Sequence, residues 1–310
     1  MSPFKSLASL TLVITLLGCA NPDGADTFTE SGVLSGSTLT QAQCAAFGDT
    51  GIWVTVEGRG ECLRYFHSGL QATNPVVHIW FHGDRMSQNF NGGAWVHDYY
   101  FDHNTPEALA ARAETGARNS GVPYIRFSRP GVYGSTGSHK QRRQAREGLV
   151  INAALDALKA RHGIEALALS GQSGGGHVVA ALLPRRTDIV CAAITSGVVS
   201  VRKRSRIRGW GGRDITGYST FYDPIEHVAE IPAAAKRTIF IIGDPKDSNV
   251  PFVTQGDYYQ ALVDAGHQAE IIRAKGRGRS NHGLSHAGFG VIRDCLEGMP
   301  ASAIARKHSN

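Results

Sequence analysis

The segment from Ala166 to Val179 holds the residues whose spacing is best suited to chemistry. An apolar run is followed by Gly171-Gln172-Ser173-Gly174-Gly175 and then by a second apolar run. A serine on a sharp strand-to-helix turn needs small neighbours two positions before and after it, because larger side chains would block passing chain segments. Its hydroxyl then stands exposed beside the free N–H groups of the helix. Ser173 is therefore the candidate nucleophile.

A glycine-rich phosphate loop is the competing interpretation of this segment. Neither G-x-x-x-x-G-K-[ST] nor G-x-G-x-x-G is present here, which disfavours nucleotide binding. A serine hydroxyl also needs a nearby base, and that base needs an orienting carboxylate.

Two later loops supply candidates for these roles. One follows the apolar segment Thr238–Ile242 and carries Asp244 and Asp247, and the other follows Glu270–Arg273 and carries His282 and His286. Either aspartate could instead only shape a turn. The two histidines are spaced like a metal pair, but no third ligand at suitable spacing and no HExxH motif accompanies them, so we expect no metal ion.

Together these motifs resemble the α/β-hydrolase superfamily of serine esterases, lipases and exopeptidases, over roughly residues 50–298. The resemblance implies the order serine, acid, histidine along the chain. Asp247 matches the acid of the family's G-x-x-x-D-x-x-V-P loop, with Asp244 as the alternative. His282 is the expected base because it precedes Gly-Leu on a glycine-rich loop, and His286 is the alternative base. No cofactor is implied.

The resemblance also implies an oxyanion hole formed by the backbone N–H groups of Asp84 and Gly174. Asp84 ends the turn His82-Gly83-Asp84 after an apolar segment. We expect His82 itself to be structural, hydrogen-bonded at the end of that strand. The loop Ser128–Ser135 loosely resembles the family's Arg-x-Gly-x-G-x-S loop and is interpreted as scaffold, with Arg129 as a candidate substrate contact.

Short apolar segments and helical patterns alternate from Val76 onward, which is typical of a mostly parallel sheet with helices on both faces. The first three segments leave no room for helices and should include a hairpin. We therefore predict an α/β protein with the α/β-hydrolase fold: an eight-stranded sheet and a short insertion after the sixth strand. The expected strands are Ile52–Val56, Leu63–Phe66, Val76–Phe81, Tyr124–Phe127, Ala166–Leu169, Ile189–Thr195, Thr238–Ile242 and Glu270–Arg273. The expected helices are Glu107–Thr115, Arg142–Ala160, Gly176–Leu183, Asp257–Ala265 and Ile292–Glu297.

Two segments interrupt this alternation and are candidates for covering a site. The insertion, about residues 197–232, combines six basic residues with four aromatic residues. A solvated face is the default interpretation of these charges, and attraction of anionic substrates or lipid is the alternative. The aromatic segment 90–103 is expected either to wall the pocket or to pack beneath the insertion.

The composition is that of an ordinary globular protein. The chain has 310 residues, 42% of them hydrophobic and 19% charged, with a formal net charge of +6. Disordered, collagen-like and coiled-coil proteins are excluded. The positive surplus is too small to indicate a nucleic-acid partner.

The N-terminus predicts export. Lys5, a short apolar run over residues 10–17 and the sequence Leu16-Leu17-Gly18-Cys19 resemble a bacterial lipoprotein signal. We expect residues 1–18 to be removed, Cys19 to carry lipid, residues 19–43 to form a flexible tether, and residues 44–310 to form the domain. Ala20 resembles the outer-membrane sorting pattern, which places the protein in the cell envelope on a membrane. A soluble secreted protein is the alternative.

Four other cysteines can oxidise outside the cytoplasm. Cys44 and Cys62 flank one strand-like segment and are the favoured pair. Cys191 and Cys295 form either a second bridge or two buried free thiols.

The favoured function is hydrolysis of a small carboxylic ester through an acyl-enzyme on Ser173, Asp247 and His282. Two alternatives remain open at this point. The same residue types cleave amides in serine exopeptidases, which would make a peptide the substrate. A non-catalytic lipoprotein would keep the fold only as a binding surface.

Overall fold

The computed structural model describes residues 28–90, 93–101, 104–234 and 237–310. The strands of the central sheet are β1 (Gly51–Val56), β2 (Arg59–Ser68), β3 (Asn74–Phe81), β6 (Tyr124–Phe127), β7 (Ile164–Gln172), β8 (Ile189–Thr195), β9 (Thr238–Gly243) and β10 (Ala269–Arg273). A separate pair consists of β4 (Met86–Gln88) and β5 (Ala94–Val96).

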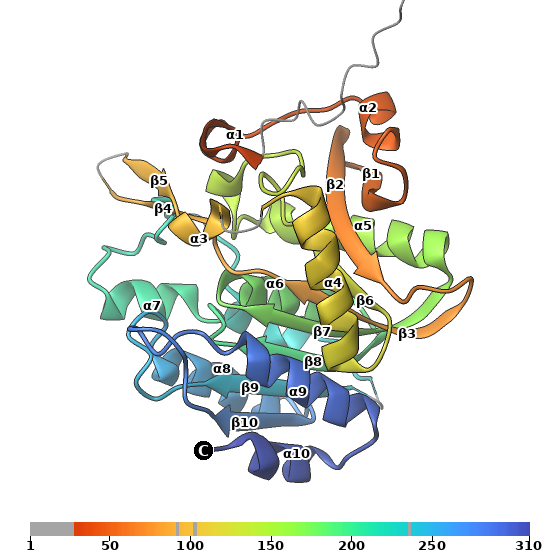
Figure 1. Cartoon of the computed structure of the whole chain (residues 1–310). Helices are drawn as coiled ribbons and strands as arrows, with labels where there is room; N and C mark the ends of the chain where they lie inside the picture. The colour runs from red at the N-terminus through yellow and green to blue at the C-terminus, as the bar shows by residue number, and fades with distance from the viewer. Residues whose placement is uncertain (1–27, 91–92, 102–103, 235–236) are drawn as a thin grey trace, which may run out of the picture.

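The eight strands lie in the order β1-β2-β6-β3-β7-β8-β9-β10 (Figure 1). β1 and β2 form an antiparallel hairpin, and β2 is also antiparallel to β6. Every later pair, from β6–β3 to β9–β10, is parallel. The predicted sheet, its hairpin and the insertion after the sixth strand, β8, are thus confirmed.

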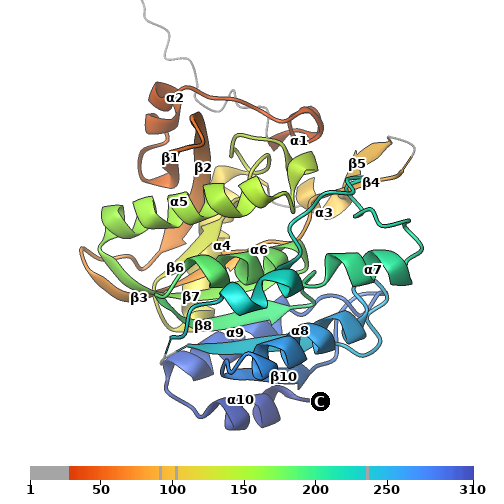
Figure 2. The same ribbon diagram turned by 180° about the vertical axis from the view of Figure 1, so that it is seen from behind.

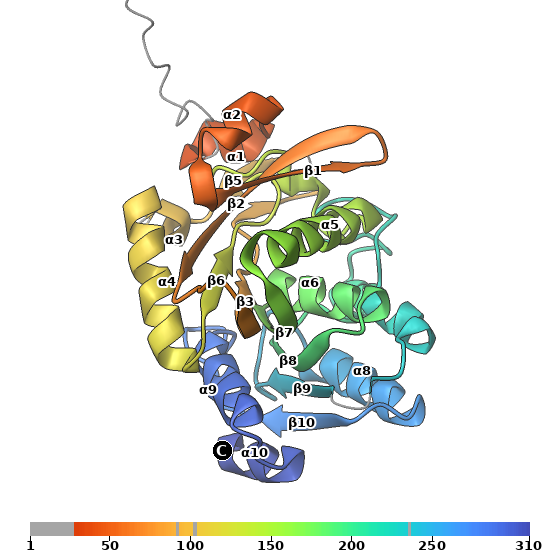
Figure 3. The same cartoon turned by 90° about the vertical axis from the view of Figure 1, so that its right-hand side faces the viewer.

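Helices cover both faces of the sheet. The longer ones are α4 (Pro106–Ser120), α5 (Ala145–His162), α6 (Gly174–Leu182), α8 (Phe252–Asp264), α9 (Ser285–Leu296) and α10 (Ala301–His308). The short ones are α1 (Glu30–Ser35), α2 (Gln41–Ala45), α3 (Asp98–Phe101) and α7 (Val201–Ile207). Figure 3 shows α5, α6 and α8 on one face and α4, α9 and α10 on the other.

The sheet is buried on both faces because successive residues of its strands point to opposite sides. In β3, Val77 and Ile79 join the apolar cluster that also contains Ile151 and Leu155 of α5, as the helical spacing in α5 predicts. Trp80 points the other way, into a cluster formed with α4. This double burial explains why the parallel strands read as nearly continuous apolar runs.

The expected flexible tether of residues 19–43 does not extend as far as residue 43. Val33 of α1 is fully buried. The backbone of Ser37 pairs with that of Gly137, and Thr40 caps α2 through reciprocal hydrogen bonds with Gln43. A buried apolar side chain and satisfied backbone groups hold this segment on the domain. Cys19 and the rest of the predicted signal and tether up to residue 27 lie outside the described residues.

Both cysteine pairs considered in the sequence analysis are bridged. Cys44 is joined to Cys62, as the sequence predicts. Cys191 is joined to Cys295, so these two residues are not free thiols. Within the described ranges, no helix is both long and apolar enough to cross a membrane.

Candidate active site

Ser173 occupies the sharp turn between β7 and α6. Its backbone has φ 58° and ψ −116°, a conformation that is strained for a residue with a side chain. A Cβ on Gly171 would lie 2.2 Å from the carbonyl oxygen of Gly175, and a Cβ on Gly175 would lie 2.1 Å from that of Phe81. The two glycines are therefore needed for close passage of the chain, as predicted from the G-x-S-x-G spacing.

His282 and Asp247 form a partly buried pair. The Nδ1 atom of His282 lies 2.7 Å from Oδ2 of Asp247, whose side chain has no exposed surface. A carboxylate only accepts hydrogen bonds, so Nδ1 carries the proton and Nε2 is the acceptor in the neutral ring. The other carboxylate oxygen of Asp247 accepts the N–H groups of Asn249 and Val250, which fixes its direction.

The alternative acid and base lie elsewhere. Asp244 accepts the N–H groups of Lys246 and Gly276 and shapes its own loop. His286 lies in the first turn of α9 and is exposed. Of the two candidate pairs, the structure brings together only Asp247 and His282.

Ser173 and His282 line one open cavity of about 540 Å³. The Nε2 atom of His282 is buried and has no hydrogen-bond partner in the described part of the chain. An acceptor nitrogen is thus left unused beside a cavity that also contains a serine hydroxyl. A cavity of this size suits a small organic molecule.

Gln172 ties the serine turn to the loop that carries His282. Its Nε2 donates to the carbonyl oxygen of His282 at 2.7 Å, and its Oε1 accepts the N–H of Leu284 at 2.9 Å and the hydroxyl of Thr195 at 3.1 Å. The sequence analysis missed this residue because it occupies the variable position before the serine. Only its neighbours in space reveal its role.

The predicted oxyanion turn also lies against Ser173. A Cβ on Gly83 would be 3.2 Å from the Cβ of Ser173, and a Cβ on Gly174 would be 2.0 Å from Oδ1 of Asp84. Neither the N–H of Asp84 nor that of Gly174 donates to any described residue. The two donors proposed for an oxyanion are therefore close to the serine and unused.

A buried ion-pair cluster holds this turn in place. Asp84 Oδ1 lies 3.1 Å from Arg129, and its Oδ2 lies 3.0 Å from Arg142 and 2.7 Å from Arg143. Arg129 also pairs with Glu147 at 2.8 Å, and Arg143 with Asp214 at 2.8 Å. Burial by itself raises the pKa of the Asp84 carboxyl, but the three guanidinium groups together lower it well below its usual range.

This cluster corrects the assignment of Arg129 as a substrate contact. Its side chain has no exposed surface and is occupied by two carboxylates. His82, in contrast, is structural as predicted. Its Nδ1 donates to the carbonyl oxygen of Gly83, and its Nε2 accepts the N–H of Arg129. Burial lowers the pKa of His82 well below its ordinary value, and the Arg85 and Arg129 cations lower it further, so the ring is neutral.

The insertion and the aromatic segment meet at the cavity. Arg204 and Ile215 of the insertion line it, as do His97 and Tyr99 of the aromatic segment. Phe90 packs against Trp210 of the insertion. The aromatic segment thus both lines the cavity and packs against the insertion. Figure 2 shows α7 near β4 and β5 at one end of the sheet.

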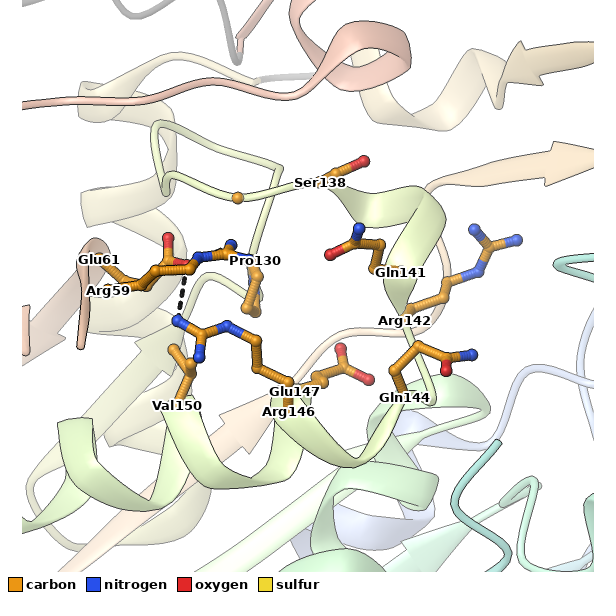
Figure 4. Close-up of a pocket in the computed structure, with 11 residues that line it drawn as sticks. Arg59, Glu61, Pro130, Ser138, Gln141, Arg142, Gln144, Arg146, Glu147 and Val150 are labelled. Atoms are coloured by element: carbon orange, nitrogen blue, oxygen red, sulfur yellow. Dashed lines mark hydrogen bonds and ion pairs between the residues drawn. The ribbon is translucent and has the colours of Figure 1, made fainter. Parts of the chain in front are cut away.

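A second, much smaller cavity of about 30 Å³ lies between α5 and β2. Its charged side chains already have partners: Arg146 and Arg59 pair with Glu61 (Figure 4), and Arg142 and Glu147 belong to the ion-pair cluster described above. It does not include Ser173 and offers no catalytic group. The part of the chain that the structure describes contains no cluster of three metal-ligating side chains.

Comparison of the whole structure with solved structures identifies the architecture. An acylaminoacyl peptidase from Pyrococcus horikoshii matches with a TM-score of 0.52 over 78% of this chain, at 16% identity. The chain has the α/β-hydrolase fold. The match covers only 39% of the length of that peptidase. The chain also matches the Pyrococcus furiosus esterase Pf2001 (TM-score 0.54, 14% identity, 80% of this chain and 91% of the esterase).

A further match is Est1E from Butyrivibrio proteoclasticus, with a TM-score of 0.52 and 12% identity over 81% of this chain and 98% of Est1E. No protein-family model matches the sequence. No curated protein matches it either. At these identities the likeness establishes the fold, and the chemistry has to be argued from the site itself.

Proposed function

We propose that this α/β-hydrolase-fold protein is a serine hydrolase that cleaves carboxylic esters. The observation that carries the proposal is that a serine on a strained turn shares a cavity with a partly buried histidine–aspartate pair, and that the histidine Nε2 is buried without a described hydrogen-bond partner. Most buried polar side-chain atoms in proteins have a hydrogen-bond partner. An unpartnered ring nitrogen beside a serine hydroxyl therefore favours a catalytic role for His282 over a purely structural one.

In the proposed mechanism, His282 accepts the proton of the Ser173 hydroxyl while the serine oxygen attacks the ester carbonyl. The N–H groups of Asp84 and Gly174 stabilise the negative oxygen of the tetrahedral intermediate. Asp247 orients the ring and stabilises its cationic form. His282 then gives the proton to the leaving alcohol, and water hydrolyses the acyl-enzyme by the same route. Activity should fall in mildly acidic solution, because a protonated ring cannot act as the base.

Amide cleavage by the same residues is the alternative, and one feature argues against an exopeptidase that binds a free amino terminus. Among the described residues that line the cavity, Asp84 is the only carboxylate, and three arginines already engage it. Within the described lining, no carboxylate is left for the ammonium group of a peptide. Ester hydrolysis needs no such group.

Labelling with a fluorophosphonate probe tests the proposal, because the probe reacts only with an activated serine. The wild-type protein should be labelled, and Ser173→Ala should not. His282→Ala should lower esterase turnover by about 10⁴-fold, whereas His286→Ala, a change to an exposed histidine nearby, should retain it. Turnover of para-nitrophenyl acetate by Ser173→Ala at the wild-type rate would contradict the proposal, and absence of labelling would favour a non-catalytic binding protein.

We also propose that the protein is anchored in the bacterial envelope, at the outer membrane, through lipid on Cys19. The support is the Leu16-Leu17-Gly18-Cys19 sequence after an apolar run. Cys19→Ser should shift the protein from the membrane fraction to the soluble fraction. A wild-type protein already found in the soluble fraction would identify it as secreted instead.

A further inference from the structure

The cavity that contains Ser173 is lined by more positive than negative charge. The described residues of its lining include three arginines, Arg85, Arg204 and Arg277, against one carboxylate, Asp84. Asp84 faces three further arginines behind the cavity wall, so its charge is already neutralised. The lining arginines therefore give the cavity a cationic surplus that the described residues do not neutralise.

Arg204 is the most constrained of the three. It lies on α7 with only 4% of its surface exposed. Its Nη2 donates to Oδ1 of Asn249 at 2.7 Å, its Nε donates to the carbonyl oxygen of Asn249 at 3.3 Å, and its guanidinium lies over the ring of Trp210. All of these partners are neutral, and no described carboxylate lies within ion-pair distance. Burial lowers the pKa of Arg204 to about 10, which still leaves it cationic at neutral pH.

Arg85 is held in a similar way. Its Nε donates to the hydroxyl of Tyr133, and its guanidinium lies 5.1 Å from the ring centre of Tyr99. Arg277 adds an exposed cation on the loop that carries His282, fixed by backbone hydrogen bonds with Gly283. Neither arginine forms an ion pair with a described residue.

The neighbouring buried cluster is balanced in charge, unlike the arginines that line the cavity. Arg129, Arg142 and Arg143 are matched by Asp84, Glu147 and Asp214, three charges of each sign. A buried cation without a counter-charge is costly, and an anionic ligand would remove that cost on binding. The positions of Arg204 and Arg85 on the cavity wall place such a ligand beside Ser173.

We propose that the substrate is an ester that also carries an anionic group, a carboxylate or a phosphate, and that Arg204 binds this group with help from Arg85 and Arg277. A planar guanidinium with neutral neighbours suits both anions, because it donates two parallel hydrogen bonds. The proposal rests on the ester hydrolysis proposed above and names the class of ester.

Matched pairs of small esters test the charge preference and locate the charge. Mono(para-nitrophenyl) adipate is compared with para-nitrophenyl hexanoate, which puts the anion in the acyl part. Para-acetoxybenzoate is compared with para-acetoxybenzamide, which puts it in the alcohol part. In at least one pair, kcat/KM of the anionic ester should be about 10-fold higher or more. Competitive inhibition of hexanoate hydrolysis by adipate or by inorganic phosphate then distinguishes a carboxylate from a phosphate site.

Two variants on one helix assign the preference to Arg204. Arg204→Gln should lower the anionic-to-neutral ratio of kcat/KM by about 10-fold or more, mainly through KM, and weaken inhibition by the anion. Arg206→Gln removes the same charge from an exposed position that does not line the cavity, and should leave the ratio unchanged. Arg277→Gln, at an exposed position, provides a second test that does not depend on tolerance of a buried change.

Equal kcat/KM within both ester pairs, together with no inhibition by either anion, would overturn the proposal while leaving ester hydrolysis intact. An equal change of the ratio in Arg204→Gln and Arg206→Gln would also overturn it, because it would indicate long-range attraction rather than a binding site. Failure of every ester to be hydrolysed, with no fluorophosphonate labelling, would instead contradict the proposed function.

Discussion

Replacing Asp84 by asparagine tests whether the buried ion pairs hold the oxyanion turn. The change preserves the size of the side chain but removes one of three negative charges that balance three arginines. The cluster is left with one unmatched positive charge, and an amide N–H faces guanidinium donors. Breaking a buried pair in this way costs about 3–5 kcal/mol. For a domain of this size, that lowers the melting temperature by about 6–10 °C.

The matched control is Glu226→Gln. Glu226 pairs with Arg202 at 2.8 Å, but the two side chains are 47% and 50% exposed. An exposed pair contributes about 0–1 kcal/mol, so the melting temperature should move by about 2 °C or less. Calorimetric unfolding of both variants at neutral pH gives the comparison. Equal shifts in the two variants would refute the argument that burial and charge balance stabilise the turn.

The pH dependence of the stability difference between the wild-type protein and Asp84→Asn tests whether the charge of Asp84 causes it. The pKa of Asp84 is lowered in the folded protein, so its stabilising effect is complete above its unfolded pKa of about 4 and is lost as the pH falls further. The wild-type advantage over Asp84→Asn in unfolding free energy should therefore shrink below about pH 4. An advantage that stays constant down to pH 2 would indicate packing rather than charge.

Three further predictions follow from other contacts. Gln172→Leu removes the hydrogen bonds to the His282 loop and should lower kcat of ester hydrolysis by about 10-fold or more with little change in melting temperature. Gly175→Ala places a Cβ 2.1 Å from a backbone oxygen and should abolish fluorophosphonate labelling, whereas Gly256→Ala, with open space around it, should retain labelling. Burial lowers the pKa of His177 to about 4, so the free energy of unfolding should fall as the pH drops below about 6.5. In His177→Gln, the dependence of this free energy on pH, measured by urea denaturation, should be weaker by up to about 1.4 kcal/mol per pH unit.

Local patterns in the sequence are sufficient for the sheet and the serine turn, and they limit the acid to Asp244 or Asp247 and the base to His282 or His286. Each depends on residues close together in the chain, such as the glycines around Ser173, or on loops that follow parallel strands and so meet at one edge of the sheet. The short helices α1, α2, α3 and α7, the eight-residue helix α10 and the β4–β5 pair were not predicted, because so few residues give no clear periodic pattern and tertiary contacts stabilise them.

Other features of the site could not be predicted from the sequence because they depend on residues distant in the chain. The six members of the ion-pair cluster extend from Asp84 to Asp214, and no spacing rule relates them. Arg204 is one of six basic residues in the insertion, and only its burial distinguishes it from exposed neighbours such as Arg206. Gln172 has no motif of its own.

The bridge between Cys191 and Cys295 has a consequence for how the molecule can open. It joins β8 to α9 across a sequence separation of 104, and the closed ring contains the insertion, the Asp247 loop and the His282 loop. Local fraying of the last strands therefore cannot carry these loops far from β8 while the bridge is intact. Reduction would release about a third of the chain as one long arm, so a reducing environment should first make this region accessible to proteases, before the rest of the sheet unfolds.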